Sequence, residues 1–162
     1  MHVAKIESTP RPDASVVVYT VGTFDLLHVG HLALLQYCKT LGDIVVAGVA
    51  SDRVVRRYKT NVPVIPLAQR EEMLKALRCV DVVRPYHELE YVSACRELNV
   101  DVFVIGEDWG AKSHNVDVED YLRKEGKQIV QVLYDRRTSS TRIKKNVVSQ
   151  YHRRQDMHEM IA

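Results

Sequence analysis

The chain has 162 residues, enough for one compact domain with its own core and too few for two ordinary ones. Hydrophobic residues make up 46% and charged residues 27%, as in soluble globular proteins. The net charge of +2 gives no general reason to expect nucleic acid as a partner, and no apolar run reaches the roughly 20 residues of a membrane span. Three widely spaced cysteines favour buried thiols over a disulfide framework or a zinc site, so we expect a cytoplasmic protein.

Residues 1–15 contain two prolines and no periodic pattern of apolar residues. We expect them to form a flexible leader. Continuous apolar runs typical of buried strands follow at 16–23, 43–51, 80–86, 100–108 and 128–134. Helical patterns separate them at 31–42, 67–78, about 90–98 and 117–125, and a last helix is expected at 140–154. Gly42 is the expected C′ residue of the first helix, and a Pro-containing link is expected before the second.

This alternation predicts an α/β fold: a Rossmann-like, doubly wound, five-stranded parallel sheet in a single domain. We expect the domain to cover 16–145 and a C-terminal helix or tail to cover 146–162. Ligands of such sheets bind beyond the carboxyl ends of the strands, where the strand order reverses. The turns that follow the first, second, fourth and fifth strands should therefore share one rim.

The first of these turns lies in the segment VGTFDLLHVGH at 21–31, which carries His28 and His31 at the start of a helix. Their spacing places both on one helical face, and Gly30 lets a ligand approach the backbone. A helix N-terminus favours anions, so two imidazole donors there suit a phosphate that gains negative charge during transfer. The glycine-rich dinucleotide and P-loop fingerprints are absent. Zinc binding, for which no third ligand fits a pattern, and histidines without a function remain alternatives.

Five further segments accompany this motif: LGDIVVAGVASD, RRYKT, QREEML, VDVFVIGEDW and RRTSSTRIKK. With them, the chain resembles the HxGH nucleotidyltransferase superfamily from about Val17 to Lys145. Within it, the chain is most similar to the cytidylyltransferase family, in particular the small bacterial members typified by glycerol-3-phosphate cytidylyltransferase. The resemblance implies that 16–145 is a nucleotidyltransferase domain.

The resemblance also implies roles for individual residues. The nucleotide would be bound by Gly22, Thr23, Phe24, His28, His31, Arg70, Asp108, Trp109, Ser140 and Thr141. The catalytic residues would be His28, His31, Lys59, Arg136 and Arg137; because RRTSST is shorter than the family's Arg-Thr…Ser-Thr segment, the functional arginine of the last two stays open. Lys59 and Asp25 would serve the acceptor side. Asp25 could touch a metal ion or simply cap the helix.

The implied reaction is transfer of CMP from CTP to a small phosphorylated alcohol such as glycerol 3-phosphate, with release of pyrophosphate. It needs alignment and charge neutralisation rather than a protein nucleophile. Mg²⁺ is expected with the triphosphate, held mainly by phosphate oxygens and water, and a homodimer is expected. An adenylyltransferase that uses ATP on a sugar phosphate or flavin phosphate is the alternative, and a non-catalytic nucleotide-binding protein is a third hypothesis. No nucleic acid and no membrane is expected as a partner.

Overall fold

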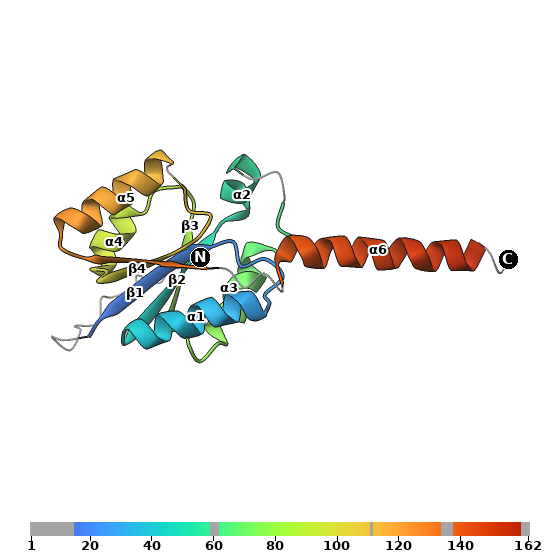
Figure 1. The fold of residues 1–162 in the computed structure, drawn as a ribbon, viewed down its shortest axis with the longest axis horizontal. Coiled ribbons are helices and arrows are strands. Elements are labelled where there is room, and N and C mark those ends of the chain that lie inside the picture. The colour runs from blue at the N-terminus through green and yellow to red at the C-terminus, as the bar shows by residue number, and fades with distance from the viewer. Residues whose placement is uncertain (1–14, 59–61, 111, 134–137, 160–162) are drawn as a thin grey trace, which may run out of the picture.

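A five-stranded sheet lies between two layers of helices, and one long helix projects from this body (Figure 1). The computed structural model describes residues 15–58, 62–110, 112–133 and 138–159. The strands are β1 (Val17–Gly22), β2 (Ile44–Ala50), β3 (Val82–Tyr86), β4 (Val102–Gly106) and β5 (Gln128–Val132). The helices are α1 (Val29–Leu41), α2 (Asp52–Tyr58), α3 (Leu67–Lys75), α4 (Val92–Leu98), α5 (Ser113–Lys124) and α6 (Ser140–Glu159).

The strand order is β3-β2-β1-β4-β5, and every pairing is parallel. Val18 lies at the centre, opposite Val45 of β2 on one side and Val102 of β4 on the other. The chain winds outward from β1 to β3 and then returns to add β4 and β5. The order therefore reverses between β1 and β4, which confirms the predicted doubly wound sheet and fixes its switch point.

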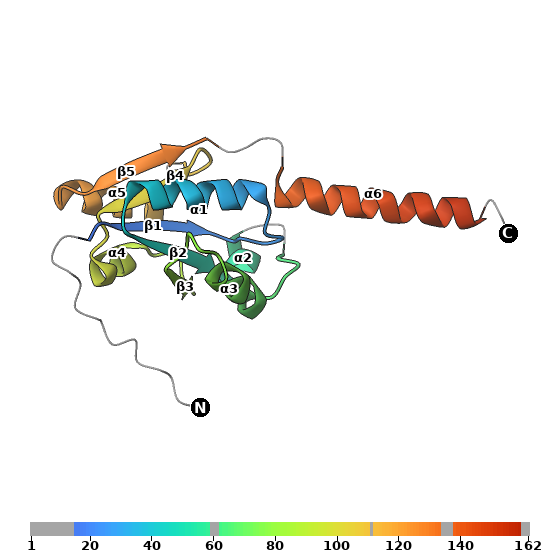
Figure 2. The same cartoon turned by 90° about the horizontal axis from the view of Figure 1, so that it is seen from below.

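Alternate residues of the central strands face opposite helical layers, as strand geometry requires. Tyr19 and Phe103 belong to the core cluster that includes Cys95 of α4 and Leu122 of α5. On the opposite face, Val18 belongs to a cluster with Cys38 of α1, and Figure 2 shows α1 running along this face. Both faces are covered by helices, which explains why the strands are continuous apolar runs rather than alternating ones.

An aspartate directly precedes each of β2, β3 and β4 and closes the amino edge of the sheet. Each carboxylate accepts a hydrogen bond from a backbone amide at the start of the neighbouring strand: Asp43 from Val16 (2.8 Å), Asp81 from Val45 (2.7 Å) and Asp101 from Val17 (2.9 Å). Two lysines neutralise two of them: Lys39 Nζ, from α1, lies 2.8 Å from Asp81, and Lys127 Nζ, from the connection between α5 and β5, lies 2.6 Å from Asp101. We call these three carboxylates the aspartate row.

The five strands lie within the predicted ranges, but α2 occupies part of what we expected to be a link. Val54 and Val55 are buried with Ala50, and this packing supports a helix of seven residues that propensity alone would not sustain. Gly42 also differs from the expectation. It ends α1 in an extended conformation, φ −174°, and a Cβ there would lie 2.7 Å from Val18 Cγ2. Close approach of the backbone to β1, rather than a left-handed turn, explains this glycine.

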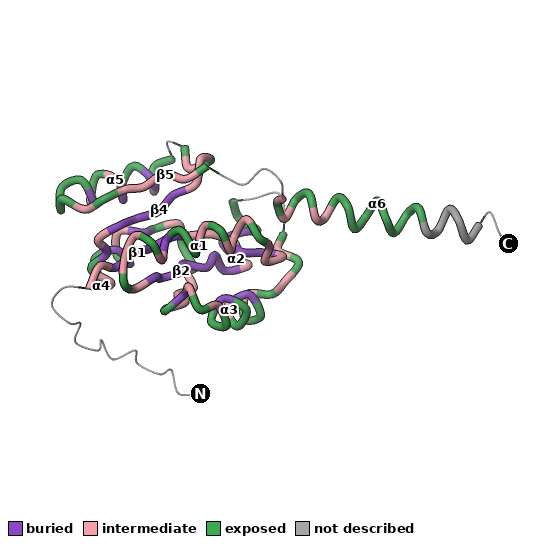
Figure 3. The backbone as a smooth tube through the Cα atoms, turned by 60° about the horizontal axis from the view of Figure 1, so that its bottom comes forward, coloured by how far each residue is buried: buried purple, intermediate pink, exposed green. Residues whose placement is uncertain are grey.

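Helix α6 runs without a break through the expected domain boundary at 145/146. Residues 145–153 of this helix are exposed (Figure 3). Among the residues described, no helix combines the length and apolarity needed to cross a membrane. The predicted leader lies outside the described residues apart from Ser15.

Candidate active site

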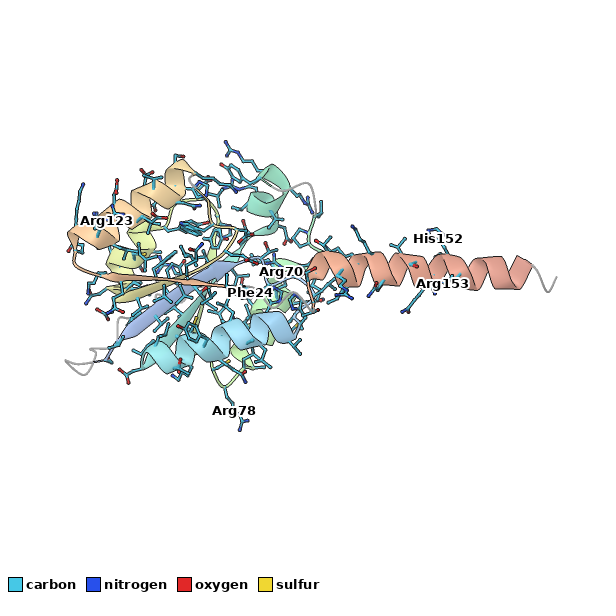
Figure 4. All side chains as sticks on the ribbon, viewed as in Figure 1. Phe24, Arg70, Arg78, Arg123, His152 and Arg153 are labelled. Carbon is cyan, nitrogen blue, oxygen red and sulfur yellow. The ribbon has the colours of Figure 1, made fainter. Side chains whose placement is uncertain are left out.

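The candidate site lies at the carboxyl edge of the sheet, around the switch point between β1 and β4. The turn after β1 enters α1 there, and the segment after β4 leads toward α5. Helix α6 begins at the same edge: Ser140 Oγ donates a hydrogen bond to the carbonyl of Asp25 (2.6 Å). Figure 4 shows Phe24 and Arg70 where α6 leaves the body, and His152 and Arg153 farther out along α6.

The two histidines form a stacked pair at the start of α1. His28 is the N-cap, and its Nδ1 accepts a hydrogen bond from the Gly30 amide (3.1 Å), which leaves its proton on Nε2. Its ring stacks on His31 with centroids 3.8 Å apart and an interplanar angle of 22°. A Cβ on Gly30 would lie 3.0 Å from the His28 ring, so glycine leaves room for the imidazole. The structure thus brings together the two residues that the HxGH spacing placed on one face.

The turn that carries these histidines has a strained backbone. Phe24 and Leu26 adopt φ values of 51° and 49°, a left-handed conformation that costs a non-glycine residue about 1–2 kcal/mol. The Phe24 ring is buried and meets His31 edge-on at 5.4 Å. A Cβ on Gly22 would lie 3.1 Å from that ring. Gly22 and Phe24 therefore support the histidine pair by packing, and their contact with a triphosphate, like that of Thr23, stays a prediction.

Arg70 is not a cation on the open rim, as we expected, but a buried brace beneath it. Its side chain is 0% exposed, and Nη2 lies 2.5 Å from Asp52 Oδ1. The same guanidinium donates to the carbonyl oxygens of Thr23, Ala50 and Ile65. It thereby ties the ends of β1 and β2 to the loop before α3. We expected Arg70 to contact phosphate directly. Its buried contacts instead give it a role in positioning the rim.

Asp25 is likewise buried and fully engaged. Its Oδ1 accepts from the amides of Val64 and Ile65, both at 3.0 Å, and its Oδ2 lies 2.7 Å from Lys144 Nζ. Burial raises the pKa of Asp25, but the hydrogen bonds from Lys144 and from the two amides outweigh it and hold the pKa below its ordinary value. Asp25 is therefore a charged carboxylate that joins three segments of the chain.

These contacts correct both roles that the sequence suggested for Asp25. Its side chain is 4% exposed and occupied by three donors, so it does not fit a magnesium ligand or an acceptor contact. It does not cap α1 either, because His28 does. Within the part of the chain that the structure describes, no three histidine, cysteine or acidic side chains form a metal-binding group.

The start of α6 differs from the expectation by one residue. Ser139, not Ser140 or Thr141, caps the helix: its Oγ accepts from the Arg142 amide at 3.1 Å. Ser140 and Thr141 lie in the first turn, and their contact with phosphate stays a prediction. Lys144 is the site residue that the sequence analysis missed. The available signal was its spacing of four from Ser140, which places both side chains on the face of α6 that meets the turn after β1.

Asp108 and Trp109 follow β4 on the other side of the switch point. Asp108 is exposed, whereas Trp109 is anchored: its Nε1 donates to Glu119 Oε1 at 2.7 Å, and its ring lies 5.6 Å from that of Tyr91. Asn115 Nδ2 donates to the carbonyls of Trp109 and of Gly110. These contacts hold the backbone of the segment in place, and its proximity to a nucleoside stays a prediction.

Three of the predicted catalytic residues, Lys59, Arg136 and Arg137, lie outside the described residues. The described residue that follows the two arginines is Thr138. Its Cγ2 lies 3.5 Å from where a Cβ on Gly30 would be, so the chain meets the histidine turn directly after Arg137.

Residues 19–146 match the family model described as cytidylyltransferase-like. The chain belongs to this family. The matched span contains all the predicted site residues, from Gly22 to Thr141, and also Lys144.

Curated relatives and a solved structure agree with this assignment. The chain is 34% identical over 148 residues to the FAD synthase of Thermococcus onnurineus, covering 87% of this chain and 97% of that protein. It is 41% identical over 132 residues to the bifunctional protein HldE of Streptomyces coelicolor, covering 81% of this chain but only 28% of HldE. The chain thus spans little more than a quarter of that relative. The crystal structure of the lipopolysaccharide core biosynthesis protein of Thermoplasma volcanium is similar with a TM-score of 0.62 and 26% identity, over 75% of this chain and 98% of that one.

Proposed function

We propose that this cytidylyltransferase-like protein transfers CMP from CTP to a small phosphorylated alcohol of the glycerol 3-phosphate type. The observation that carries the proposal is the stacked pair of His28 and His31 at the N-terminus of α1, beside the switch point of the sheet. Imidazole donors and the helix dipole both favour negative charge at this place. The pair suits a phosphate that becomes more negative as the reaction proceeds.

In the proposed reaction, a phosphate oxygen of the acceptor attacks the α-phosphorus of CTP. A new P–O bond forms, the bond from the α-phosphorus to the bridging oxygen breaks, and the electron pair leaves with pyrophosphate. His28 and His31 stabilise the phosphates in the transition state. One of Arg136 and Arg137 binds the triphosphate. Lys59 binds the acceptor phosphate.

Mg²⁺ in this proposal accompanies the triphosphate. Because the Asp25 carboxylate is already occupied, phosphate oxygens and water supply the ligands that the ion requires. The ion supplies charge neutralisation, and the protein's share is to hold the phosphates in place.

ATP with a sugar phosphate or flavin phosphate is the second candidate. One relative of nearly the same length is called FAD synthase, and FAD contains an adenine nucleotide. The description of the matching family, cytidylyltransferase-like, favours CTP. Pyrophosphate release measured with each of the four nucleoside triphosphates, against a panel of phosphorylated alcohols, sugar phosphates and flavin phosphate, decides between them. Release with CTP and a phosphorylated alcohol is the expected result; release with ATP alone gives the second candidate, and no release with any pair contradicts an enzymatic function.

The two sides of the proposed site separate by mutation. Lys59→Ala raises the KM for the phosphorylated acceptor and lowers turnover, while direct binding of CTP changes little. Replacement of the functional arginine, tested as Arg136→Ala and Arg137→Ala, weakens CTP binding itself. Calorimetric titration of CTP into each variant, with kinetics in both substrates, measures this. Loss of CTP binding in Lys59→Ala with an unchanged acceptor KM would reverse the assignment.

A homodimer is part of the same proposal. Exposed apolar side chains on the projecting helix α6, at Val147, Val148 and Tyr151, support it, because a partner could cover them. Sedimentation equilibrium at micromolar concentration is expected to give twice the chain mass. A monomer under those conditions contradicts this part of the proposal.

A further inference from the structure

Lys144 on α6 reaches back into the body of the protein. Its side chain is 25% exposed, and its Nζ lies 2.7 Å from Asp25 Oδ2 and donates to the carbonyl of Val62 at 3.1 Å. The ammonium thus bridges the turn after β1 and the loop at 62–65. It is the partner of a carboxylate that is itself 4% exposed.

The loop at 62–65 is held from both sides by this pair. Lys144 binds the carbonyl of Val62, and Asp25 binds the amides of Val64 and Ile65. A buried carboxylate that loses its counter-charge is strongly disfavoured, so the grip of Asp25 on the loop depends on Lys144. Three segments far apart in the sequence therefore meet at one charge pair: the histidine turn, the loop at 62–65 and the start of α6.

Each of these segments carries residues of the proposed site or lies between two of them in the sequence. The loop lies between Lys59 and the brace Arg70 in the sequence, the turn carries the histidine pair, and α6 starts with Ser140. We propose that Lys144 and Asp25 are positioning residues that fix the position of the acceptor side of the site relative to its nucleotide side. The kinetic part of this inference rests on the proposed function; its structural part does not.

Amide hydrogen exchange of the full-length protein tests the structural part directly. Lys144→Met is expected to speed exchange of the Val64 and Ile65 amides by at least about 10-fold, because their acceptor loses its counter-charge. Lys144→Arg restores most of the protection. Lys144→Gln, which keeps a donor for Val62, replaces Lys144→Met if that variant does not fold. Unchanged exchange at both amides in the charge-removing variant overturns the inference.

Steady-state kinetics and calorimetry test the kinetic part. In Lys144→Met, kcat/KM for the acceptor is expected to fall by about 10- to 100-fold, since small displacements of aligned groups have effects of this size. The dissociation constant of the nucleotide changes by less than about threefold, and Lys144→Arg recovers most of the activity. An equal loss in nucleotide affinity contradicts a positioning role between the two sides.

Lys127→Met is the matched control at the opposite edge of the sheet. Lys127 is also 25% exposed and lies 2.6 Å from Asp101, which itself accepts a backbone amide. This variant is expected to lose stability but to keep kcat and both KM values; a kinetic defect like that of Lys144→Met would show that loss of stability alone explains the effect. If the unmodified protein turns over no substrate pair, the proposed function fails, and the exchange measurement still decides the structural part.

Discussion

The two edges of the sheet use buried and half-buried charge in different ways. At the amino edge, the aspartate row repeats one arrangement three times: the residue before a strand accepts an amide within one residue of the start of the neighbouring strand. At the carboxyl edge, Asp25 and Arg70 each bind several backbone groups, and these come from the ends of β1 and β2 and from the loop before α3. The first arrangement closes the end of a sheet, and the second ties together the segments around the candidate site. The comparison indicates which charges serve the fold alone and which also serve the site.

The largest expected effect concerns the brace at the carboxyl edge. Arg70→Met leaves three carbonyl groups and Asp52 without their partner, so it should lower the free energy of unfolding by about 3–5 kcal/mol. Urea unfolding measures it. Arg78→Met is the control: Arg78 is exposed, and its replacement should change the free energy of unfolding by no more than about 0.5 kcal/mol. Equal effects of the two variants would remove the distinction between brace and surface charge.

The histidine pair should matter mainly for rate, although His28→Ala also removes the N-cap of α1 and should cost about 1 kcal/mol of stability. His28→Ala and His31→Ala are each expected to lower kcat by about 10²–10³, the usual cost of losing one preorganised donor, with a much smaller change in nucleotide affinity. Kinetics together with thermal unfolding separate the two effects. His152→Ala on the exposed part of α6 is the control. Near-normal turnover of both site variants rules out the phosphate role. Zinc bound to the unmodified protein and absent from these variants would favour a metal site.

The aspartate row should show the opposite behaviour. Asp101→Ala leaves the Val17 amide without its acceptor and removes the ion pair with Lys127, and we expect a loss of about 1–3 kcal/mol in the free energy of unfolding. The kcat of the folded protein should not change. A lower kcat of Asp101→Ala under conditions in which the variant is fully folded would mean that the amino edge also influences the site.

The smallest effect expected is a pH dependence of stability at Asp25. Because the pKa of Asp25 is lowered in the fold, its charged form stabilises the protein above the unfolded pKa of about 4. This contribution is lost as the pH falls through the lower, folded value. The difference in unfolding free energy between the protein and Asp25→Asn should therefore be largest at pH 7 and shrink toward pH 3. Asp117→Asn, at an exposed position, serves as the control; an Asp25→Asn difference that grows on acidification contradicts the assignment.

The sequence predicted the repeating parts of this fold well. All five strands followed from apolar runs, because strands buried on both faces leave a strong pattern. The position of the switch point came only from the strand pairing in the structure. Helix α2 did not follow, since a seven-residue helix with three arginines has no apolar period and depends on the packing of Val54 and Val55.

Within the site, the sequence predicted the residues that act through local spacing. His28 and His31 are three apart, and their meeting is a property of one helix start. Arg70 and Asp25 were placed at the correct edge but on the wrong side of it, because their partners are backbone groups of other segments. Composition and spacing carry no information on whether a charged side chain turns outward to a ligand or inward to a loop. Lys144 was missed because its spacing of four from Ser140 indicates a shared helix face but not the carboxylate that this face meets.

The left-handed backbone at Phe24 and Leu26 has a consequence for how this turn can vary. Glycine or asparagine would relieve the strain at either position, yet only Leu26 is free to accept the exchange, because the Phe24 ring is buried against His31. In a library randomised at both codons, in cells whose growth depends on the activity of this protein, glycine and asparagine should become enriched at position 26. An aromatic residue should persist at 24 despite its unfavourable backbone.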